Sequence, residues 1–295
     1  MDRRYTFAAW WHLLSLDAPT VAVLWAWLFA RAMHLRLPSV ALLLLGLATW
    51  LFYVADRILH GLRKERRELL RDRHIFHARH RRAFLSAALF LAGLSVWMAL
   101  TRMYPRALRE DLFLSICALL YLWLVHAASR VSAHRQMRWL PKEMVVGIIF
   151  ASATAVPAWS RLNQRSGVEK IQLFEAAVFF AALCWINCVA IVKWEAEPLL
   201  PLDRLDRSTP FAAHPSTRWA GDHLQAILAF IALLSIIAAY LAPAGGLRAV
   251  YLAALLSSGL ILALDARRSR IAPLHLRIAV DAALLTPLAF FFLLR

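Results

Sequence analysis

The sequence predicts an all-α integral membrane protein, and three observations support this fold class. Hydrophobic residues make up 61% of the 295-residue chain, and the mean hydropathy is +0.59. Charged residues make up only 18%, compared with roughly 25% in soluble domains. Nine stretches are also long and apolar enough to cross a bilayer as helices, which takes about 20 residues each. We therefore expect one polytopic transmembrane domain over residues 1–295.

The nine predicted helices are joined by breaks that Pro and Gly often mark. Pro38 precedes the second helix, and a Pro-Ala-Gly-Gly run at 243–246 separates the seventh from the eighth. Ahead of the first helix, Trp10 and Trp11 lie beside His12 in a short segment. We interpret that segment as an interfacial anchor, because aromatic rings favour the headgroup region. The predicted helices lie near 18–34, 39–59, 84–101, 112–128, 144–160, 172–194, 222–242, 247–264 and 275–294.

The basic residues predict the orientation in the membrane. With the N-terminus placed in the cytoplasm, the inside segments contain 24 of the 34 Lys and Arg residues. The positive-inside rule then favours a cytoplasmic N-terminus and an outside C-terminus, and we expect the bacterial inner membrane. The net charge of +16 lies in short clusters between apolar runs. That placement is typical of topology signals, so we expect membrane lipids as partners and no nucleic acid.

Two acidic helix ends are the first candidates for chemistry. Asp56 ends the second predicted helix and shares a face with His60, four residues later, so the two could hold a divalent ion. The alternative is an Asp that pairs with His60 or a nearby Arg. Glu195 ends the sixth predicted helix, and Glu197 follows it. Such carboxylates suit Mg²⁺ and substrate phosphates, but they could also form a solvated acidic loop.

Basic residues on the same side are the second group of candidates. A basic stretch over 63–82 either attracts anionic lipid headgroups or supplies cations for a diphosphate, which Arg binds with a planar fork. Lys142, at the start of the fifth predicted helix, could reach a phosphate or act as a topological anchor. Asp281 lies four residues after Arg277 in the ninth predicted helix. It is either a functional intramembrane carboxylate or one half of a structural ion pair.

The number of predicted helices and the placement of these acidic ends resemble the UbiA superfamily of intramembrane prenyltransferases. The likeness covers nearly the whole chain at the level of topology, and Leu16-Asp17-Ala18-Pro19 is similar to the start of that family. Its members carry an NxxxDxxxD motif after helix 2. Here that motif maps onto Phe52, Asp56 and His60, so only the central Asp is kept.

The family's second motif, of the form DxxxD after helix 6, maps most nearly onto Ile191 and Glu195, with Glu197 close by. The resemblance implies catalytic roles for Asp56 and Glu195 and a Mg²⁺ ion that binds the donor diphosphate. The metal ligands implied in this way are Asp56, His60, Glu195 and Glu197.

The function implied by the resemblance is the transfer of an isoprenoid group from a polyprenyl diphosphate to a lipophilic acceptor that the sequence does not identify. A non-catalytic membrane protein that binds anionic lipid or a partner protein is the alternative, and a small-solute transporter that uses Asp281 is a third. A basic residue between helices 4 and 5 is usual in the family. The cations expected to hold the diphosphate are Arg57, Arg63, Lys142 and Arg130.

Overall fold

A computed structural model describes most of the chain, and all of the described residues lie in helices or their connections. It covers residues 6–61, 76–77, 79–103, 105–131, 141–162, 167–196, 214–292 and 294, without the side chains of 60, 61, 124–131 and 196. Of these residues, 87% are helical and none is in a strand. The all-α fold class is therefore confirmed for the described part of the chain.

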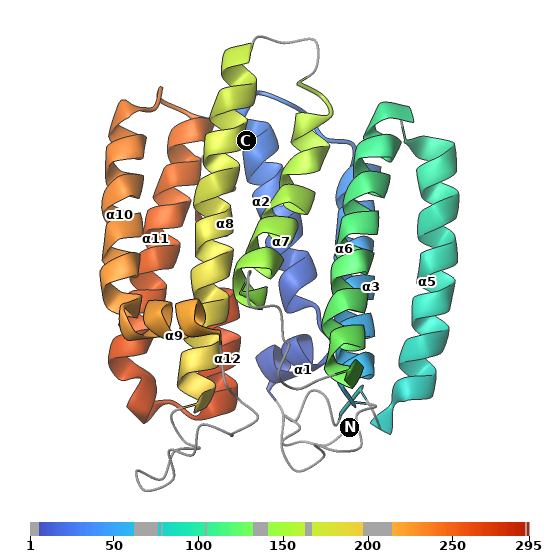
Figure 1. Cartoon of the computed structure of the whole chain (residues 1–295). Coiled ribbons are helices and arrows are strands. Elements are labelled where there is room, and N and C mark those ends of the chain that lie inside the picture. The colour runs from blue at the N-terminus through green and yellow to red at the C-terminus, as the bar shows by residue number, and fades with distance from the viewer. Residues whose placement is uncertain are drawn as a thin grey trace, which may run out of the picture.

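Long helices run side by side and form a bundle (Figure 1). Six of them are long and apolar enough to cross a membrane, and a bent pair of helices at the N-terminus makes a seventh candidate. This supports a membrane protein, whereas the predicted count of nine spans is not confirmed. The described helices are α1 (Phe7–Leu13), α2 (Asp17–Ala32), α3 (Ser39–Gly61), α5 (Arg81–Arg102), α6 (Pro105–Val131), α7 (Lys142–Trp159), α8 (Gly167–Ala196), α9 (Pro215–Asp222), α10 (Leu224–Leu241), α11 (Gly246–Arg267), η3 (Arg268–Arg270), α12 (Pro273–Ala282) and η4 (Thr286–Phe290).

The core lies where α2, α7, α8 and α11 pack against one another. Trp25 of α2 stacks on Phe180 of α8 with ring centroids 4.3 Å apart, and Phe29 meets the same ring edge-on. Gly147 lets α7 approach α8 closely, because a Cβ there would lie 2.8 Å from the backbone nitrogen of Trp185. Since small residues allow such close backbone packing in membranes, α8 is held firmly at the centre of the bundle.

The outer helices bury few of their residues, and their exposed apolar faces are compatible with lipid contact. In the most apolar stretch of α5 only 6% of the residues are buried, against 50% in α11. Helix α5 packs on α3, and α6 packs on α7. The exposed apolar side chains of α5 and α6 include Phe90, Trp97 and Phe113, which is the pattern expected of a lipid-facing surface.

The two ends of the chain differ from the predicted helices. The segment over 275–294 is not one span, because α12 ends at Ala282 and the 3-10 helix η4 follows. Pro287 lies within η4; it has no N–H to donate, and it disfavours α geometry at the preceding residue. At the other end, α1 and α2 meet at 90°, and His12 and Leu13 are buried. The segment before the first span is therefore packed into the protein.

Candidate functional site

Polar and charged side chains gather at one end of the bundle, which we call the α1 end. It contains α1, the first turns of α2, α7 and α12, and the last turns of α3 and α8 (Figure 1). Ionisable groups inside an apolar bundle are costly and therefore mark candidate functional sites. Two groups of side chains stand out at this end: a pocket beside Glu195 and a buried cluster around His12.

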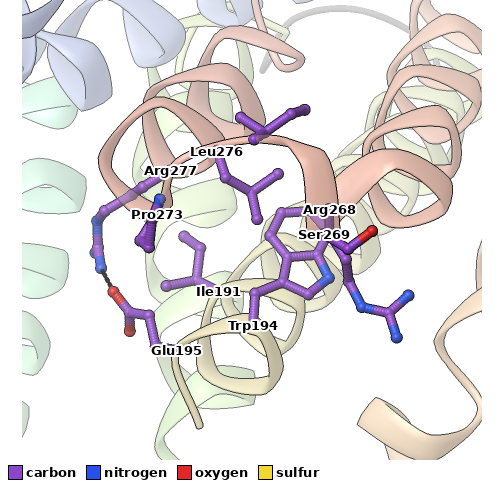
Figure 2. Close-up of a pocket in the computed structure, with 9 residues that line it drawn as sticks. Ile191, Trp194, Glu195, Arg268, Ser269, Pro273, Leu276 and Arg277 are labelled. Carbon is purple, nitrogen blue, oxygen red and sulfur yellow. Dashed lines mark hydrogen bonds and ion pairs between the residues drawn. The ribbon is translucent and has the colours of Figure 1, made fainter. Parts of the chain in front are cut away.

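The pocket beside Glu195 has a volume of about 260 Å³ and lies between the end of α8 and the start of α12. Figure 2 shows Glu195 and Arg277 joined across it by an ion pair, with the Trp194 ring forming part of the wall. Arg277 Nε is buried and has no hydrogen-bond acceptor among the described residues. The other residues that line the pocket are Ile191, Arg268, Ser269, Ile271, Pro273 and Leu276.

Local sequence signals explain how this pocket forms. Helix α11 ends near Arg267, and η3 carries the chain across to α12, which begins at Pro273. Proline is favoured at the first turn of a helix because its fixed φ suits that position and its missing N–H costs nothing there. The turn places Arg268 and Arg277 on opposite sides of the α8 end (Figure 2). The pocket therefore combines two guanidinium groups and one carboxylate with an apolar wall.

Trp194 is held in place by Asp265, a fully buried carboxylate near the end of α11. The indole Nε1 donates to Asp265 Oδ1 at 2.8 Å, and Gln225 Nε2 donates to Oδ2 at 2.8 Å. Arg268 and Lys193 lie 3.5 and 3.9 Å from Oδ1. Because Asp265 is satisfied on both oxygens, it fixes the orientation of the ring beside Glu195.

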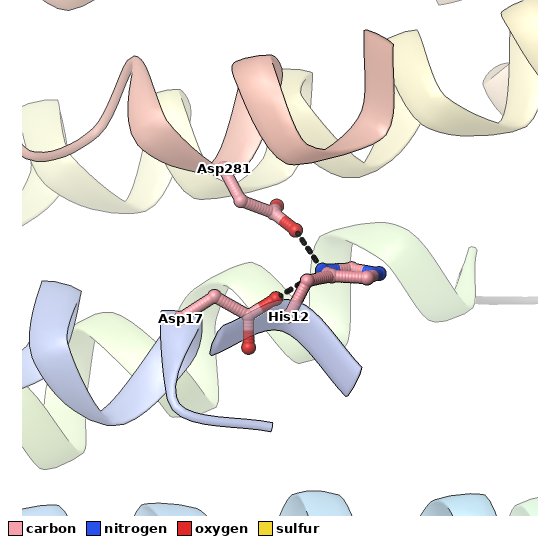
Figure 3. A group of neighbouring side chains, drawn as sticks. All are labelled: His12, Asp17 and Asp281. Carbon is pink, nitrogen blue, oxygen red and sulfur yellow. Dashed lines mark hydrogen bonds and ion pairs between the residues drawn. The ribbon is translucent and has the colours of Figure 1, made fainter. Parts of the chain in front are cut away.

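The second group is a buried cluster formed by His12 of α1, Asp17 of α2 and Asp281 of α12 (Figure 3). His12 Nδ1 lies 2.7 Å from Asp17 Oδ2 and 3.7 Å from Asp281 Oδ2. Asn187 of α8 donates from Nδ2 to Asp281 Oδ1 at 3.2 Å. Arg57 of α3 lies 3.8 Å from Asp17. Side chains from α1, α2, α3, α8 and α12 thus meet in one polar cluster.

The corner between α1 and α2 positions His12 for this contact. Ser15 has a φ of 62°, a left-handed conformation that is uncommon for a residue other than Gly. Arg57 stabilises the corner by donating to the backbone oxygen of His12 at 2.9 Å and to Ser15 Oγ at 2.6 Å. His77 Nε2 lies 3.2 Å from the same hydroxyl oxygen. These contacts hold the corner so that the His12 ring faces both carboxylates.

The structure brings only some of the predicted site residues together. Glu195 lines the pocket, whereas Asp56 does not. Asp56 lies within electrostatic reach of Tyr121 on α6, whose hydroxyl donates to the backbone oxygen of Lys142 at 3.4 Å. Lys142 is largely exposed, and its Nζ lies 3.8 Å from Glu143. Asp56 and Lys142 thus occupy the α3–α6–α7 side of the α1 end, and Glu195 occupies the α8–α12 side.

The remaining predicted residues either contact other parts of the protein or lie outside the described residues. Arg57 is buried and contacts the α1–α2 corner and Asp17, so in this structure it stabilises the protein. Arg277 pairs with Glu195, and Asp281 lies beside His12. Four predicted residues lie outside what the structure describes, either entirely or in their side chains: His60, Arg63, Arg130 and Glu197.

Sequence reasoning missed His12 and Asp17 as site residues. Both were visible, His12 beside the paired tryptophans and Asp17 ahead of the first predicted span. A buried ionisable group next to an apolar run is the signal that could have identified them. Asp281 was recognised as a candidate, but its neighbours Asn187 and His12 are 94 and 269 residues away in sequence.

Comparisons with known proteins do not place the chain in a family. No protein-family model matches the sequence, and neither a curated protein nor a solved structure matches it. The functional conclusions therefore depend on the geometry of the pocket and the buried cluster.

Proposed function

We propose that this protein transfers an isoprenoid group from a polyprenyl diphosphate to a lipophilic acceptor within the membrane, as its resemblance to the UbiA superfamily implies. The pocket beside Glu195 is the observation that carries the proposal, because it pairs Arg268 and Arg277 with an apolar wall at one end of an apolar bundle. An isoprenoid diphosphate has the same division, with a highly charged head and a hydrocarbon tail.

The two arginines would bind the head of this donor. A guanidinium presents several N–H donors in a planar fork that matches phosphate oxygens. Arg277 Nε is buried without an acceptor among the described residues, so a phosphate oxygen would satisfy it. Arg268 is partly exposed at the opposite wall and already lies near Asp265. A diphosphate between the arginines would draw Arg277 away from Glu195.

Glu195 would then be available to Mg²⁺. In phosphate sites Mg²⁺ is usually bound by one or two carboxylates together with substrate phosphates, so this single carboxylate fits the ion. Asp56 does not line the pocket, and we assign it no contact with this ion. When bound, Mg²⁺ neutralises charge that develops on the departing diphosphate.

Transfer would begin with cleavage of the bond between the allylic carbon and the diphosphate oxygen, and the electron pair would leave with the diphosphate. Trp194, whose ring Asp265 holds in place, would stabilise the allylic cation through its aromatic face. Ile191 and Leu276 would keep water from the cation. The acceptor would attack the cation and lose a proton to the released diphosphate.

A direct test is diphosphate release by the purified full-length protein with Mg²⁺ and donors of three to four isoprene units. We expect release with formation of a prenylated product, and a loss of at least about 100-fold in Glu195→Gln and Arg277→Gln, as is typical when a group that stabilises developing charge is removed. Asp222→Asn, on the exposed end of α9, is the matched control. Activity that is absent with every donor, or equal in all variants, would refute the proposal.

A non-catalytic lipid-binding protein is the second candidate, because the Glu195–Arg277 ion pair leaves the pocket without an uncommitted carboxylate in this structure. The same arginines would then bind the phosphate of an anionic lipid. Saturable binding of phosphatidylglycerol in nanodiscs, weakened in Arg277→Gln and accompanied by no diphosphate release, would favour this function over transfer.

A further inference from the structure

The cluster of His12, Asp17 and Asp281 is separate from the Glu195 pocket, since none of the three residues lines that pocket. We propose that these three side chains bind a first-row transition-metal dication of the Mn²⁺ or Zn²⁺ class. The proposal does not depend on prenyl transfer, because it concerns different ligands and is tested with the metal alone.

The geometry of the three ligand atoms suits one ion. His12 Nδ1 and one oxygen from each carboxylate all lie within 4.8 Å of one another. Ligand atoms bound tetrahedrally at about 2.1 Å from an ion stand roughly 3.4 Å apart. The observed separations from Nδ1 are 2.7 Å to Asp17 and 3.7 Å to Asp281. These bracket that value, so small side-chain rotations would admit the ion.

The chemistry of the ligands selects the class of metal. Imidazole nitrogen suits Zn²⁺, Fe²⁺ and related ions, whereas Mg²⁺ prefers an all-oxygen shell. Two carboxylates supply the negative charge for a dication, and Arg277, on the same helix as Asp281, pairs with Glu195. Three protein ligands would leave a further position open, which is the arrangement of reactive and not purely structural metal sites.

Asn187 provides an independent sign that the cluster takes a ligand. The residue is only 6% exposed, and its amide reaches Asp281 through Nδ2. The amide oxygen Oδ1 is buried with no hydrogen-bond donor among the described residues. An unpaired buried carbonyl costs about 1–3 kcal/mol, and an amide oxygen is a ligand that divalent ions accept. Because Asn187 already contacts Asp281 through Nδ2, an ion bound at the cluster would offer this oxygen a partner.

The supporting residues already hold the cluster in place. Arg57 fixes the His12 backbone and Ser15, and α12 carries Asp281 against α8 and α1. Preorganised ligands on rigid elements favour metal binding. Arg57 also lies 3.8 Å from Asp17 and offsets part of the negative charge of that carboxylate, so a bound ion would keep positive charge and attract an anionic or neutral oxygen as its next ligand.

Mn²⁺ binding to the chelator-treated full-length protein in detergent tests this site. We expect one Mn²⁺ per chain and, in electron spin echo spectra, modulation from one nitrogen. His12→Gln should remove the nitrogen modulation, and Asp281→Asn should weaken Mn²⁺ binding by at least about tenfold, since even outer-shell changes cost 10–100-fold. Asp222→Asn, an exposed carboxylate change on α9, should bind as the wild type does.

The wild-type spectrum tests whether the bound ion has a nitrogen ligand, even if a variant fails to fold. Bound Mn²⁺ without nitrogen modulation, or the absence of saturable binding, would overturn the proposal and leave His12, Asp17 and Asp281 as a structural ion-pair network. Equal affinity in the wild type and in a folded Asp281→Asn variant would overturn it as well. Size-exclusion profiles establish which variants are folded.

Discussion

Two carboxylates at the α1 end, the buried Asp265 and the partly buried Asp281, have different surroundings. Asp265 is fully buried and receives hydrogen bonds on both oxygens, from Trp194 and Gln225, with two cations nearby. Around Asp281, by contrast, His12 Nε2 and Asn187 Oδ1 are buried without partners among the described residues. Because native proteins satisfy most buried polar groups, the contrast separates a carboxylate that stabilises the fold from one that stands beside a ligand site.

The largest effect is expected on stability at the satisfied carboxylate. Asp265→Ala should lower the free energy of unfolding by about 3–5 kcal/mol, because it removes a fully buried carboxylate and leaves the buried Trp194 N–H and two partly exposed cations without their acceptor. Unfolding of the purified protein by a denaturing detergent measures this change. Asp222→Ala, exposed on α9, should have almost no effect. A loss below about 1 kcal/mol for Asp265→Ala would remove the distinction between the two carboxylates.

The cluster of His12, Asp17 and Asp281 should respond to metal instead. At a Mn²⁺ concentration about 100 times the dissociation constant, the wild-type protein should gain roughly 2.7 kcal/mol of stability from binding. His12→Gln should gain little under the same conditions. Thermal unfolding with and without Mn²⁺ measures both gains, and equal stabilisation of the two proteins would contradict the assignment.

Both carboxylates depend on the position of α8, which carries Asn187 and Trp194. Gly147→Ala should destabilise the protein by about 1–3 kcal/mol, because the new methyl would lie 2.8 Å from the Trp185 backbone nitrogen. In Gly46→Ala the nearest atom lies at 3.4 Å, and it belongs to the Val23 side chain. That variant should be neutral or slightly stabilised by better helix propensity. Equal effects of the two changes, seen in thermal unfolding, would show that close packing of α7 on α8 is unimportant.

An exposed ion pair should matter least. Arg106 and Glu110 of α6 lie 3.4 Å apart, and Arg106 is 60% exposed. Arg106→Gln should change the free energy of unfolding by less than about 0.5 kcal/mol, since water screens such pairs. A change as large as that of Asp265→Ala in the same detergent titration would mean that burial does not decide the energetics here.

Much of the fold was predictable because the signal is local. Eight of the nine predicted helices overlap described helices between α2 and α11, with the largest difference at α6, which begins at Pro105 and not near 112. Long apolar runs define such helices without knowledge of their neighbours. The final segment failed because Pro287 and the turn after Ala282 interrupt an equally apolar run. Hydropathy alone does not register that break.

The sites were less predictable because they depend on distant contacts. Glu195 was expected as a site residue and lines the pocket, yet its ion pair with Arg277 joins residues 82 positions apart. His12 was missed because the 90° bend before α2 relies on Ser15 in a left-handed conformation. A serine gives no sequence signal for that conformation, which Arg57 and the surrounding packing support.

Photocrosslinking tests the central claim, that the pocket beside Glu195 binds an isoprenoid diphosphate. A farnesyl diphosphate analogue with a photoreactive group in its first isoprene units, irradiated with the full-length protein and Mg²⁺, should label the end of α8 around Ile191 and the start of α12 around Leu276. Unlabelled donor should compete, and Arg277→Gln should reduce labelling. Labelling confined to other helices, or labelling that unlabelled donor does not reduce, would contradict this account.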